Sequence, residues 1–182
     1  MSITKKRQQE AYLALAERFG YTSPMQGPRI EKVIVSTGIG KKRDKKQLEL
    51  IEDRLAKITG QKPAPRAARL SIASFKVREG DTVGLQTTLR GARMYDFLDK
   101  LIHIALPRTR DFRGLSPKAI DDMGNITIGI KEHTIFPETS DEDLKDVFGL
   151  AITVVTSAKS KAEAEAFFRH LGLPLRSESV AK

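Results

Sequence analysis

The sequence predicts an α+β fold, a single domain over residues 1–182 in which helices pack on one face of a largely antiparallel sheet. Runs rich in β-branched residues, typical of strands, occur at 29–40, 81–90 and 150–158. Segments with apolar residues at helical spacing lie between them in an irregular order. A chain of 182 residues is long enough for one such core, and the second face of the sheet would stay free for a ligand.

Four helices are expected, and each is bounded by residues that start or stop helices. Glycine or proline follows the last apolar position of each helix, and Ser160 with Glu163 forms a capping box before the fourth. The expected helices end at Gly20, run between Asp44 and Gly60, run from Gly91 to a stop at Pro107, and run from Ser160 to Gly172.

A further strand is expected at residues 126–130, where isoleucine alternates with threonine and glycine. Gly124 and Asn125 come directly before it and predict the turn of a hairpin. Residues 137–147 are acidic and irregular in pattern, so we expect a loop there.

Charge is distributed unevenly along the chain. The formal net charge is +9, but residues 1–93 carry +11 and residues 94–182 carry −2. A basic half indicates a polyanionic partner, and a slightly acidic half suits a basic protein. The chain has no cysteine, which excludes disulfides and thiolate metal sites. No apolar run has the length of a signal peptide or membrane span, so we expect a cytosolic protein without a membrane partner.

The most basic stretch, QKPAPRAARLSIASFKVR at residues 61–78, contains five cations and no acid. Pro63 and Pro65 prevent a continuous helix and favour extended backbone before each proline. Such a stretch is stabilised by a polyanion, because each Lys or Arg displaces counterions from phosphate. Phe75 could stack on a base, which points to RNA. The alternative is a solvated loop with a buried Phe75.

Strand 81–90 adds a polar surface next to this stretch. Period-two alternation places Gln86, Thr88 and Arg90 on one face, and apolar residues on the other. Amide, hydroxyl and guanidinium groups suit hydrogen bonding to sugars and base edges of RNA. An ordinary solvent-facing sheet surface is the alternative.

The run TGIGK at residues 37–41 resembles a phosphate-binding loop only superficially. That motif needs a glycine where this chain has Val35, and Ser or Thr where it has Lys42. A strand end with permissive backbone is one interpretation. A second is close approach of an RNA backbone to the glycines, with the neighbouring cations meeting phosphates.

No pattern predicts catalysis, a metal site or a cofactor. His103, His133 and His170 lie on different predicted elements without metal-ligand spacing, and the acidic residues do not match a calcium loop. No serine lies in a nucleophile elbow. We therefore expect a protein that is not an enzyme.

Several segments together identify a resemblance. They are PRIEKV and GIG from Pro28, GQKP from Gly60, SFKVREG from Ser74, TLRGARM from Thr88, PRTRDFRGL from Pro107, GNITIGI from Gly124 and FPE from Phe136. In this order they resemble the family of bacterial large-subunit ribosomal proteins that bind 5S rRNA, the fifth in the conventional numbering. The match spans nearly the whole chain.

The resemblance implies a structural, cytoplasmic component of the large ribosomal subunit. Such a protein binds 5S rRNA and helps attach it to the subunit in the central protuberance. It contacts the peptidyl-site tRNA and bridges to a small-subunit head protein. The implied partners also include 23S rRNA and the other ribosomal proteins associated with 5S rRNA.

The family's functional positions carry over to three groups in this sequence. The 5S rRNA group, with two arginines added from the basic stretch, comprises Thr37, Gly38, Gly40, Gln61, Lys62, Arg66, Arg69, Thr88 and Arg90. The tRNA-proximal loop comprises Ser71, Ser74, Phe75, Lys76 and Arg78. The small-subunit bridge comprises Arg110, Asp111, Phe112, Arg113, Glu138, Asp141, Glu142, Asp143 and Asp146.

One position departs from the family pattern. Many members carry asparagine where this chain has Ser36, and serine lacks the two-sided amide that could contact a base. Two other functions remain as alternatives: a stand-alone RNA-binding or chaperone-like module outside the ribosome, and an enzyme acting on RNA or a nucleotide. The second would need a convergent carboxylate or histidine site.

Overall fold

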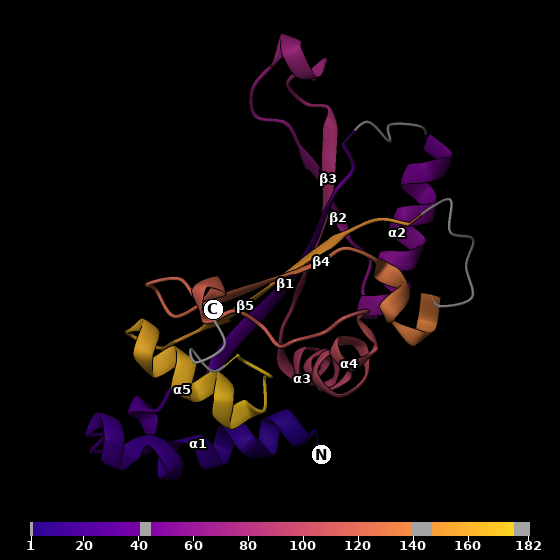
Figure 1. The fold of residues 1–182 in the computed structure, drawn as a ribbon. Helices are drawn as coiled ribbons and strands as arrows, with labels where there is room; N and C mark the ends of the chain where they lie inside the picture. Colours follow the sequence, from indigo (N-terminus) through magenta and orange to yellow (C-terminus); the bar gives the residue numbers. More distant parts are fainter. Residues whose placement is uncertain (1, 41–44, 140–146, 177–182) are drawn as a thin grey trace. The chain divides into compact units, whose positions relative to one another are not determined.

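Five strands form one sheet in the computed structural model, which describes residues 2–40, 45–139 and 147–176 (Figure 1). The order across the sheet is β2-β3-β1-β5-β4. The strands are β1 Ile30–Gly38, β2 Ala64–Ala67, β3 Thr82–Leu89, β4 Ile126–Ile130 and β5 Leu150–Thr156.

Hydrogen bonds give the strand directions. Contacts between β1 and β5 run from Arg29–Ser157 to Thr37–Gly149, so residue numbers rise along one strand as they fall along the other. β2 and β3 are also antiparallel. The predicted α+β class with a largely antiparallel sheet is therefore confirmed.

The helices lie close to their expected positions. They are α1 Ile3–Phe19, α2 Lys45–Thr59, α3 Gly91–Lys100, α4 Leu106–Arg108 and α5 Lys161–Leu171. Gly20 and Gly172 close α1 and α5 in left-handed conformation, as glycine at a helix end allows. The expected cap Asp44 lies outside the described residues.

The helix that begins at Gly91 was expected to stop at Pro107, but it continues past this proline. A π-helical turn, Leu101–Ala105, follows α3, and α4 then carries the chain through Pro107 to Arg108. Leu106 N–H bonds to the carbonyl of Leu101, five residues back. This wider turn just before the proline accommodates a residue that has no N–H of its own to donate.

The turn at Gly124-Asn125 is present, but the hairpin is shorter than expected. Gly124 has a φ of 80°, and Asn125 N–H bonds to the Asp121 carboxylate at 2.7 Å. A single bridge between Ile120 and Ile126 joins the two sides of the turn in the described chain. In the sheet order β4 lies beside β5 instead.

The described chain divides into two compact units. The first contains the described residues of 1–33, 90–128 and 153–182, and the second contains the described residues of 34–89 and 129–152.

In the first unit α1 lies alongside α5 and also packs on α3 (Figure 1). The Arg7 guanidinium donates to the carbonyl of Leu171 at 2.9 Å, and His170 Nε2 lies 2.9 Å from the carbonyl of Arg7. Side chain to backbone bonds thus join α1 to the last turn of α5.

Half of the expected capping box of α5 is confirmed, because Ser160 accepts from Glu163, whereas the Glu163 carboxylate reaches back to Lys159 and not to the N–H of Ser160. Ser160 Oγ accepts from Glu163 N–H at 3.3 Å, and the Glu163 carboxylate accepts from Lys159 N–H at 2.7 Å. The hydroxyl of Tyr21 also donates to Glu163. This glutamate is only 6% exposed, so its hydrogen bonds replace the water it loses on folding.

In the second unit α2 packs against β3 and the short turn Pro137–Thr139. Its apolar stripe is buried, with Ile51, Leu55 and Ile58 at most 2% exposed. Buried residues alternate with half-exposed ones along all of β5, along residues 33–37 of β1 and along residues 85–89 of β3, as period-two side-chain geometry requires.

Candidate nucleic-acid interface

The half-exposed face of β3 has the polar residues that the sequence analysis placed there. Gln86 and Thr88 are half-exposed, whereas Leu85, Thr87 and Leu89 are at most 4% exposed. The predicted alternation of β3 is therefore confirmed. Arg90 follows directly, is exposed, and its guanidinium lies 3.4 Å from the carbonyl of Glu31.

An exposed edge strand, β2, extends this face. It was expected only as extended backbone, and its pairing with β3 could not be read from the sequence because it depends on a partner about 20 residues away. Arg66 lies opposite Gly84 in the register, and its Nε donates to Oε1 of Gln86 at 2.7 Å. The sheet face thus carries a side-chain bond between neighbouring strands.

The alternation of β1 places Thr37 on the buried face. Thr37 is 5% exposed, and its hydroxyl donates to the carbonyl of Gly149 at 2.8 Å. A contact of Thr37 with RNA would therefore involve its backbone and not its hydroxyl. Ser36 occupies the half-exposed face instead, with its Oγ 3.4 Å from the carbonyl of Ala151.

Gly38, the last residue of β1, and Gly40, two residues beyond it, leave open space. Gly38 and Gly40 are exposed, and a Cβ added at either would meet no atom within 4 Å. Gly40 has a φ of 55°, which glycine adopts without strain.

Gln61 and Lys62 border this face at the end of α2. The Gln61 amide lies 3.4 Å from the carbonyl of Thr88, and Lys62 is paired with Glu52 at 3.2 Å while its side chain remains 84% exposed. An exposed ion pair of this kind is weak, so Lys62 can exchange it for a phosphate.

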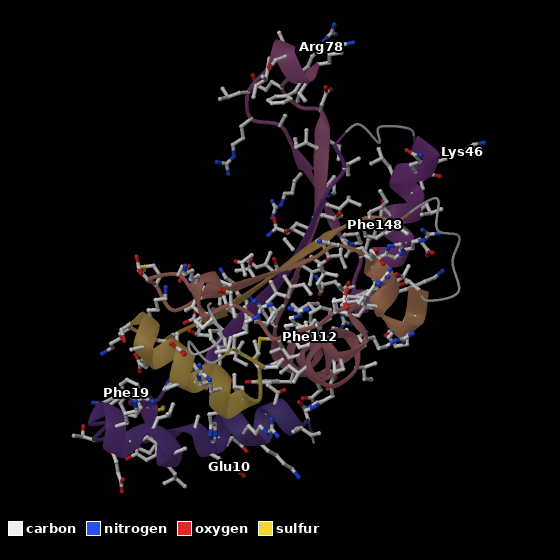
Figure 2. The ribbon with its side chains drawn as sticks, viewed as in Figure 1. Glu10, Phe19, Lys46, Arg78, Phe112 and Phe148 are labelled. Carbon is white, nitrogen blue, oxygen red and sulfur yellow. The ribbon has the colours of Figure 1, made fainter. Side chains whose placement is uncertain are left out.

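Beyond β2, residues 68–80 form an arm that returns to β3. Ala68 N–H donates to the carbonyl of Asp81 at its base, and Ile72 bridges Val77 near its end. Figure 2 shows Arg78 in this end region. The side chains of Arg69, Ser71, Ser74, Phe75, Lys76 and Arg78 are all exposed or half-exposed.

Two side chains hold the arm in shape. Ser71 Oγ accepts from Glu79 N–H at 2.9 Å, and the Asp81 carboxylate accepts from Arg78 N–H at 2.9 Å. Phe75 is 72% exposed, so the alternative of a buried phenylalanine is wrong. An exposed ring beside cations is the arrangement used by single-stranded RNA binders.

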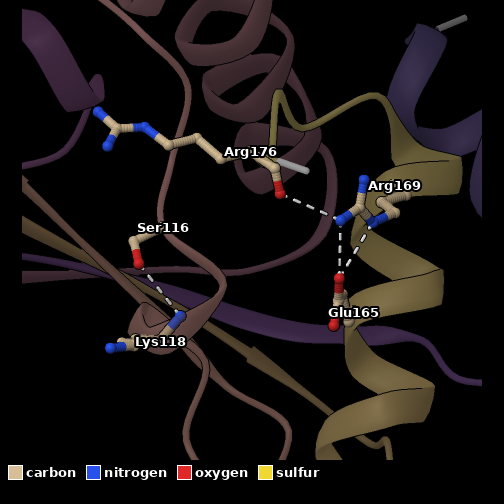
Figure 3. Close-up of polar contacts among 5 residues, drawn as sticks. All are labelled: Ser116, Lys118, Glu165, Arg169 and Arg176. Carbon is tan, nitrogen blue, oxygen red and sulfur yellow. Dashed lines mark hydrogen bonds and ion pairs between the residues drawn. The ribbon is translucent and has the colours of Figure 1, made fainter. Parts of the chain in front are cut away.

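In the first unit, the loop that follows α4 is held by the C-terminal segment. Leu115 bridges Leu175, and Arg176 Nε donates to the carbonyls of Arg113 and Gly114 at 2.9 and 3.0 Å. Figure 3 shows how Arg169, paired with Glu165, donates in turn to the carbonyl of Arg176.

Four expected bridge residues lie on this loop. Arg110, Asp111 and Arg113 are exposed, Phe112 is half-buried, and Asp111 has a φ of 54°. Glu138 is exposed in the second unit. Asp141, Glu142, Asp143 and Asp146 lie outside the described residues.

The three histidines occupy separate positions. His133 is fully buried and stacks on Phe148 with ring centroids 4.1 Å apart, His170 contacts α1, and His103 is exposed. In the described residues no cluster of three or more metal-ligating side chains occurs. Over the same residues, no helix is long and apolar enough to cross a membrane.

The architecture is that of a basic α+β scaffold with an exposed polar sheet face and a cationic arm, a class that includes RNA-binding ribosomal proteins. Residues 23–78 match the family described as Ribosomal protein L5, and residues 82–175 match the model of the C-terminal part of that family.

Relatives with the same family name are similar in sequence to this chain over nearly its whole length. The chain is 50% identical over 175 residues to the large ribosomal subunit protein uL5 of Rubrobacter xylanophilus, covering 96% of this chain and 97% of that protein. It is 49% identical over 163 residues to the protein of that name from Anaeromyxobacter sp. (strain K), covering 89% and 91%. The chain therefore belongs to the ribosomal protein L5 family, whose members are structural, non-enzymatic components of the large subunit, cytoplasmic in bacteria.

Proposed function

We propose that this protein binds 5S rRNA and helps attach it to the large subunit in the central protuberance, together with 23S rRNA and other 5S-associated ribosomal proteins. The observation that carries the proposal is the half-exposed face of β1, β2 and β3. Apart from Ile34 on β1, polar or small side chains dominate it, it is bordered by cations, and Gly38 and Gly40 leave room for a close backbone approach.

Uncharged polar side chains and cations make different, complementary contributions to RNA binding on this face. Arg66, Arg69 and Lys62 can neutralise phosphates, which supplies affinity for any RNA. Gln86 and Thr88 carry hydrogen-bonding groups without charge, which can distinguish one RNA surface from another. A wide, shallow RNA minor groove presents the sugars and base edges that such a face can reach.

The arm at residues 68–80 is proposed to contact the peptidyl-site tRNA. Its exposed ring and cations suit an RNA surface, and the bonds from Ser71 and Asp81 reduce the entropy lost on binding. The loop at residues 110–113, with the acidic residues from Glu138 to Asp146, is proposed to contact a small-subunit head protein.

A filter-binding titration tests the main proposal. Affinity for 5S rRNA should exceed that for a structured control RNA of equal length, and should fall with salt by about 0.7–0.9 log units per log unit for each phosphate contacted. Arg90→Ala should weaken 5S rRNA binding. Arg18→Ala on α1 removes the same charge elsewhere and is the control, so it should weaken binding less. Equal affinity for both RNAs, or equal effects of the two substitutions, would contradict the proposal.

A second experiment separates the arm from the sheet face. The double substitution Lys76→Ala and Arg78→Ala should leave 5S rRNA affinity within about twofold, since these side chains lie at the end of the arm. Chemical probing of tRNA in reconstituted ribosomes should change. Loss of 5S rRNA binding in this variant would contradict the division between arm and sheet.

A stand-alone RNA-binding role is distinguished by the RNA that the protein carries in cells. Sequencing the RNA recovered with the tagged protein from lysate should yield 5S and 23S rRNA. We also infer that residues 1–182 fold as a single domain, because β1, β4 and β5 each contain residues of both compact units. A single unfolding transition seen by both fluorescence and circular dichroism would support this.

A further inference from the structure

The bond between Arg66 and Gln86 determines what the sheet face can recognise. Arg66 on β2 lies opposite Gly84, and Ala64 lies opposite Gln86, so the two side chains are diagonal neighbours on one face. Gly84 has no side chain to fill the space opposite Arg66. The guanidinium can therefore extend along β3, where its Nε lies 2.7 Å from Oε1 of Gln86.

The chemistry of the two groups fixes the orientation of the amide. An arginine Nε–H can only donate, so the atom of Gln86 that faces it must be the carbonyl oxygen. The NH2 group of Gln86 then points away from Arg66. A free glutamine can rotate its amide to present either a donor or an acceptor. This one is held, and its two donors have no hydrogen-bond partner among the described residues.

The guanidinium contributes donors of the same kind. Its Nε–H is used by Gln86, and the N–H groups on Nη1 and Nη2 can reach a ligand. Apart from the second lone pair of Oε1, the pair thus offers a ligand only hydrogen-bond donors. Both residues lie on the accessible side of the sheet, with Arg66 exposed and Gln86 half-exposed.

We propose that Gln86 is a specificity-determining residue of the RNA site, and that Arg66 is its positioning residue. The ligand group is a hydrogen-bond acceptor on an RNA helix, either a ribose 2′-oxygen or a base-edge oxygen or nitrogen in the minor groove. This inference rests on the proposed RNA-binding function. It adds that selectivity depends on an oriented, uncharged amide, whereas the cations supply affinity that is independent of sequence.

The experiment compares wild type with Gln86→Met and Gln86→Glu, using 5S rRNA and a structured control RNA of equal length. Methionine keeps the length of the side chain but removes both donors. Glutamate keeps an oxygen toward Arg66 but replaces the NH2 group by an acceptor. Gln9→Glu on α1, also exposed, adds the same charge outside the group of proposed RNA-binding residues and is the matched control.

Gln86→Met should lower the affinity for 5S rRNA about fivefold to tenfold, as expected for one or two lost hydrogen bonds. The affinity for the control RNA and the salt dependence should not change, because no charge is lost. Gln86→Glu should reduce the preference for 5S rRNA more than Gln86→Met does, and Gln9→Glu should leave that preference as in wild type.

Arg66→Met tests the positioning role, because it removes a charge and also releases the amide. The salt slope should decrease by about 0.7–0.9, and the preference for 5S rRNA should fall as well. Arg66→Lys keeps the charge but not the Nε donor, so it should retain the salt slope and still lose preference. Retained preference in both Arg66 variants would overturn the positioning role.

Site-specific 2′-deoxy substitution in 5S rRNA separates the two sources of the acceptor. If Gln86 contacts a ribose, the effect of Gln86→Met disappears on the substituted RNA that lacks that hydroxyl, and if it contacts a base edge the effect persists. An unchanged preference in both Gln86→Met and Gln86→Glu would overturn the inference while wild-type selectivity stands. Wild type without any preference for 5S rRNA would instead overturn the proposed function itself.

Discussion

Thr4 donates both its backbone N–H and its hydroxyl to one oxygen of the Asp99 carboxylate, at 2.8 and 2.5 Å. The other carboxylate oxygen accepts from the N–H of Ile3 at 2.9 Å. Helix α1 has no acidic residue in its first turn, so α3 supplies the negative charge that its N-terminus needs. The start of one helix is thus capped by a residue 95 positions away.

Asp99→Asn should reduce the free energy of unfolding by about 1 kcal/mol at pH 7, the usual contribution of an N-terminal cap. Burial raises the pKa of this carboxyl, but the hydrogen bonds from Ser2, Thr4 and Ile3 lower it by more, so the net shift is downward. The contribution is therefore present above the ordinary aspartate pKa of about 3.9 and is lost as the pH falls through the lower folded value.

Urea unfolding at several pH values checks this prediction. The difference between wild type and Asp99→Asn should shrink below about pH 4, where the Asp99 carboxylate of the unfolded chain takes up a proton while that of the folded chain is still ionised. Asp96→Asn, an exposed aspartate on the same helix, is the control and should have little effect. A difference that stays constant from pH 7 to about pH 3 would contradict the role of the carboxylate.

Thr87→Val should raise the free energy of unfolding by about 1 kcal/mol. Thr87 is 1% exposed, and its hydroxyl is a buried group without a hydrogen-bond partner among the described residues. Valine has the same shape and removes the desolvation penalty of that hydroxyl. The measurement is chemical denaturation at pH 7.

Thr59→Val is the matched comparison, because Thr59 is also buried but uses its hydroxyl. Its Oγ1 lies 2.7 Å from the carbonyl of Leu55 and 3.0 Å from that of Gln61. This substitution should lower stability by about 1 kcal/mol, the ordinary value of a lost hydrogen bond. Effects of the same sign at both threonines would show that hydrogen bonding does not distinguish them.

Gly84→Ala should destabilise the protein by about 1–3 kcal/mol, as overpacking in a core does. A Cβ at this position would lie 2.9 Å from the backbone oxygen of Thr37 on β1, closer than a carbon and an oxygen can approach. Relief would require the two strands to shift apart. Thermal unfolding followed by circular dichroism measures the change.

Gly38→Ala provides the control, since a Cβ there meets nothing within 4 Å and its φ is not positive. Its stability should stay within about 0.5 kcal/mol of wild type. If Gly38→Ala destabilised the protein as much as Gly84→Ala, steric contact with Thr37 would not be the cause.

Tyr21→Phe should lower the free energy of unfolding by about 1–2 kcal/mol, because the buried Glu163 carboxylate loses a donor. Burial, followed by the hydrogen bond and charge of Glu163, raises the pKa of Tyr21 above its ordinary value. The contribution of Tyr21 is present below about pH 10 and is lost at higher pH, where the unfolded tyrosine ionises.

Denaturation between about pH 8 and pH 11 tests both the stability loss in Tyr21→Phe and the raised pKa of Tyr21. Wild type should lose more stability than Tyr21→Phe as the pH passes about 10. Tyr12→Phe, whose ring stacks on that of Tyr21 with centroids 6.5 Å apart, retains the Glu163 contact and serves as control. Parallel pH profiles for wild type and Tyr21→Phe would contradict the proposed pKa shift.

Local patterns predicted most of the regular structure. The alternation of Leu85, Thr87 and Leu89 with Gln86 and Thr88 identified both faces of β3, because period-two geometry is a property of the strand alone. Helix ends at Gly20 and Gly172 were equally visible, since glycine adopts the left-handed conformation readily. The exception was Pro107, where a π-helical turn allowed the helix to continue.

The candidate site was only partly predictable. The arm was located by its cations and prolines, but the exposure of Phe75 was not, because burial depends on what packs against a segment. Thr37 was assigned to the ligand face, whereas the strand register places its hydroxyl on Gly149. A shift of one residue along a strand reverses the face of every side chain.

By itself the sequence determined the fold class, the uneven charge and the family, because these depend on composition, local periodicity and motifs along one chain. Only the tertiary structure decided that Arg66 orients Gln86, that Asp99 caps α1 and that the Thr87 hydroxyl meets no hydrogen-bond partner within the described chain. Each of these depends on the distance between atoms of residues far apart in the chain. Such distances follow from strand pairing and helix packing, and no local pattern encodes them.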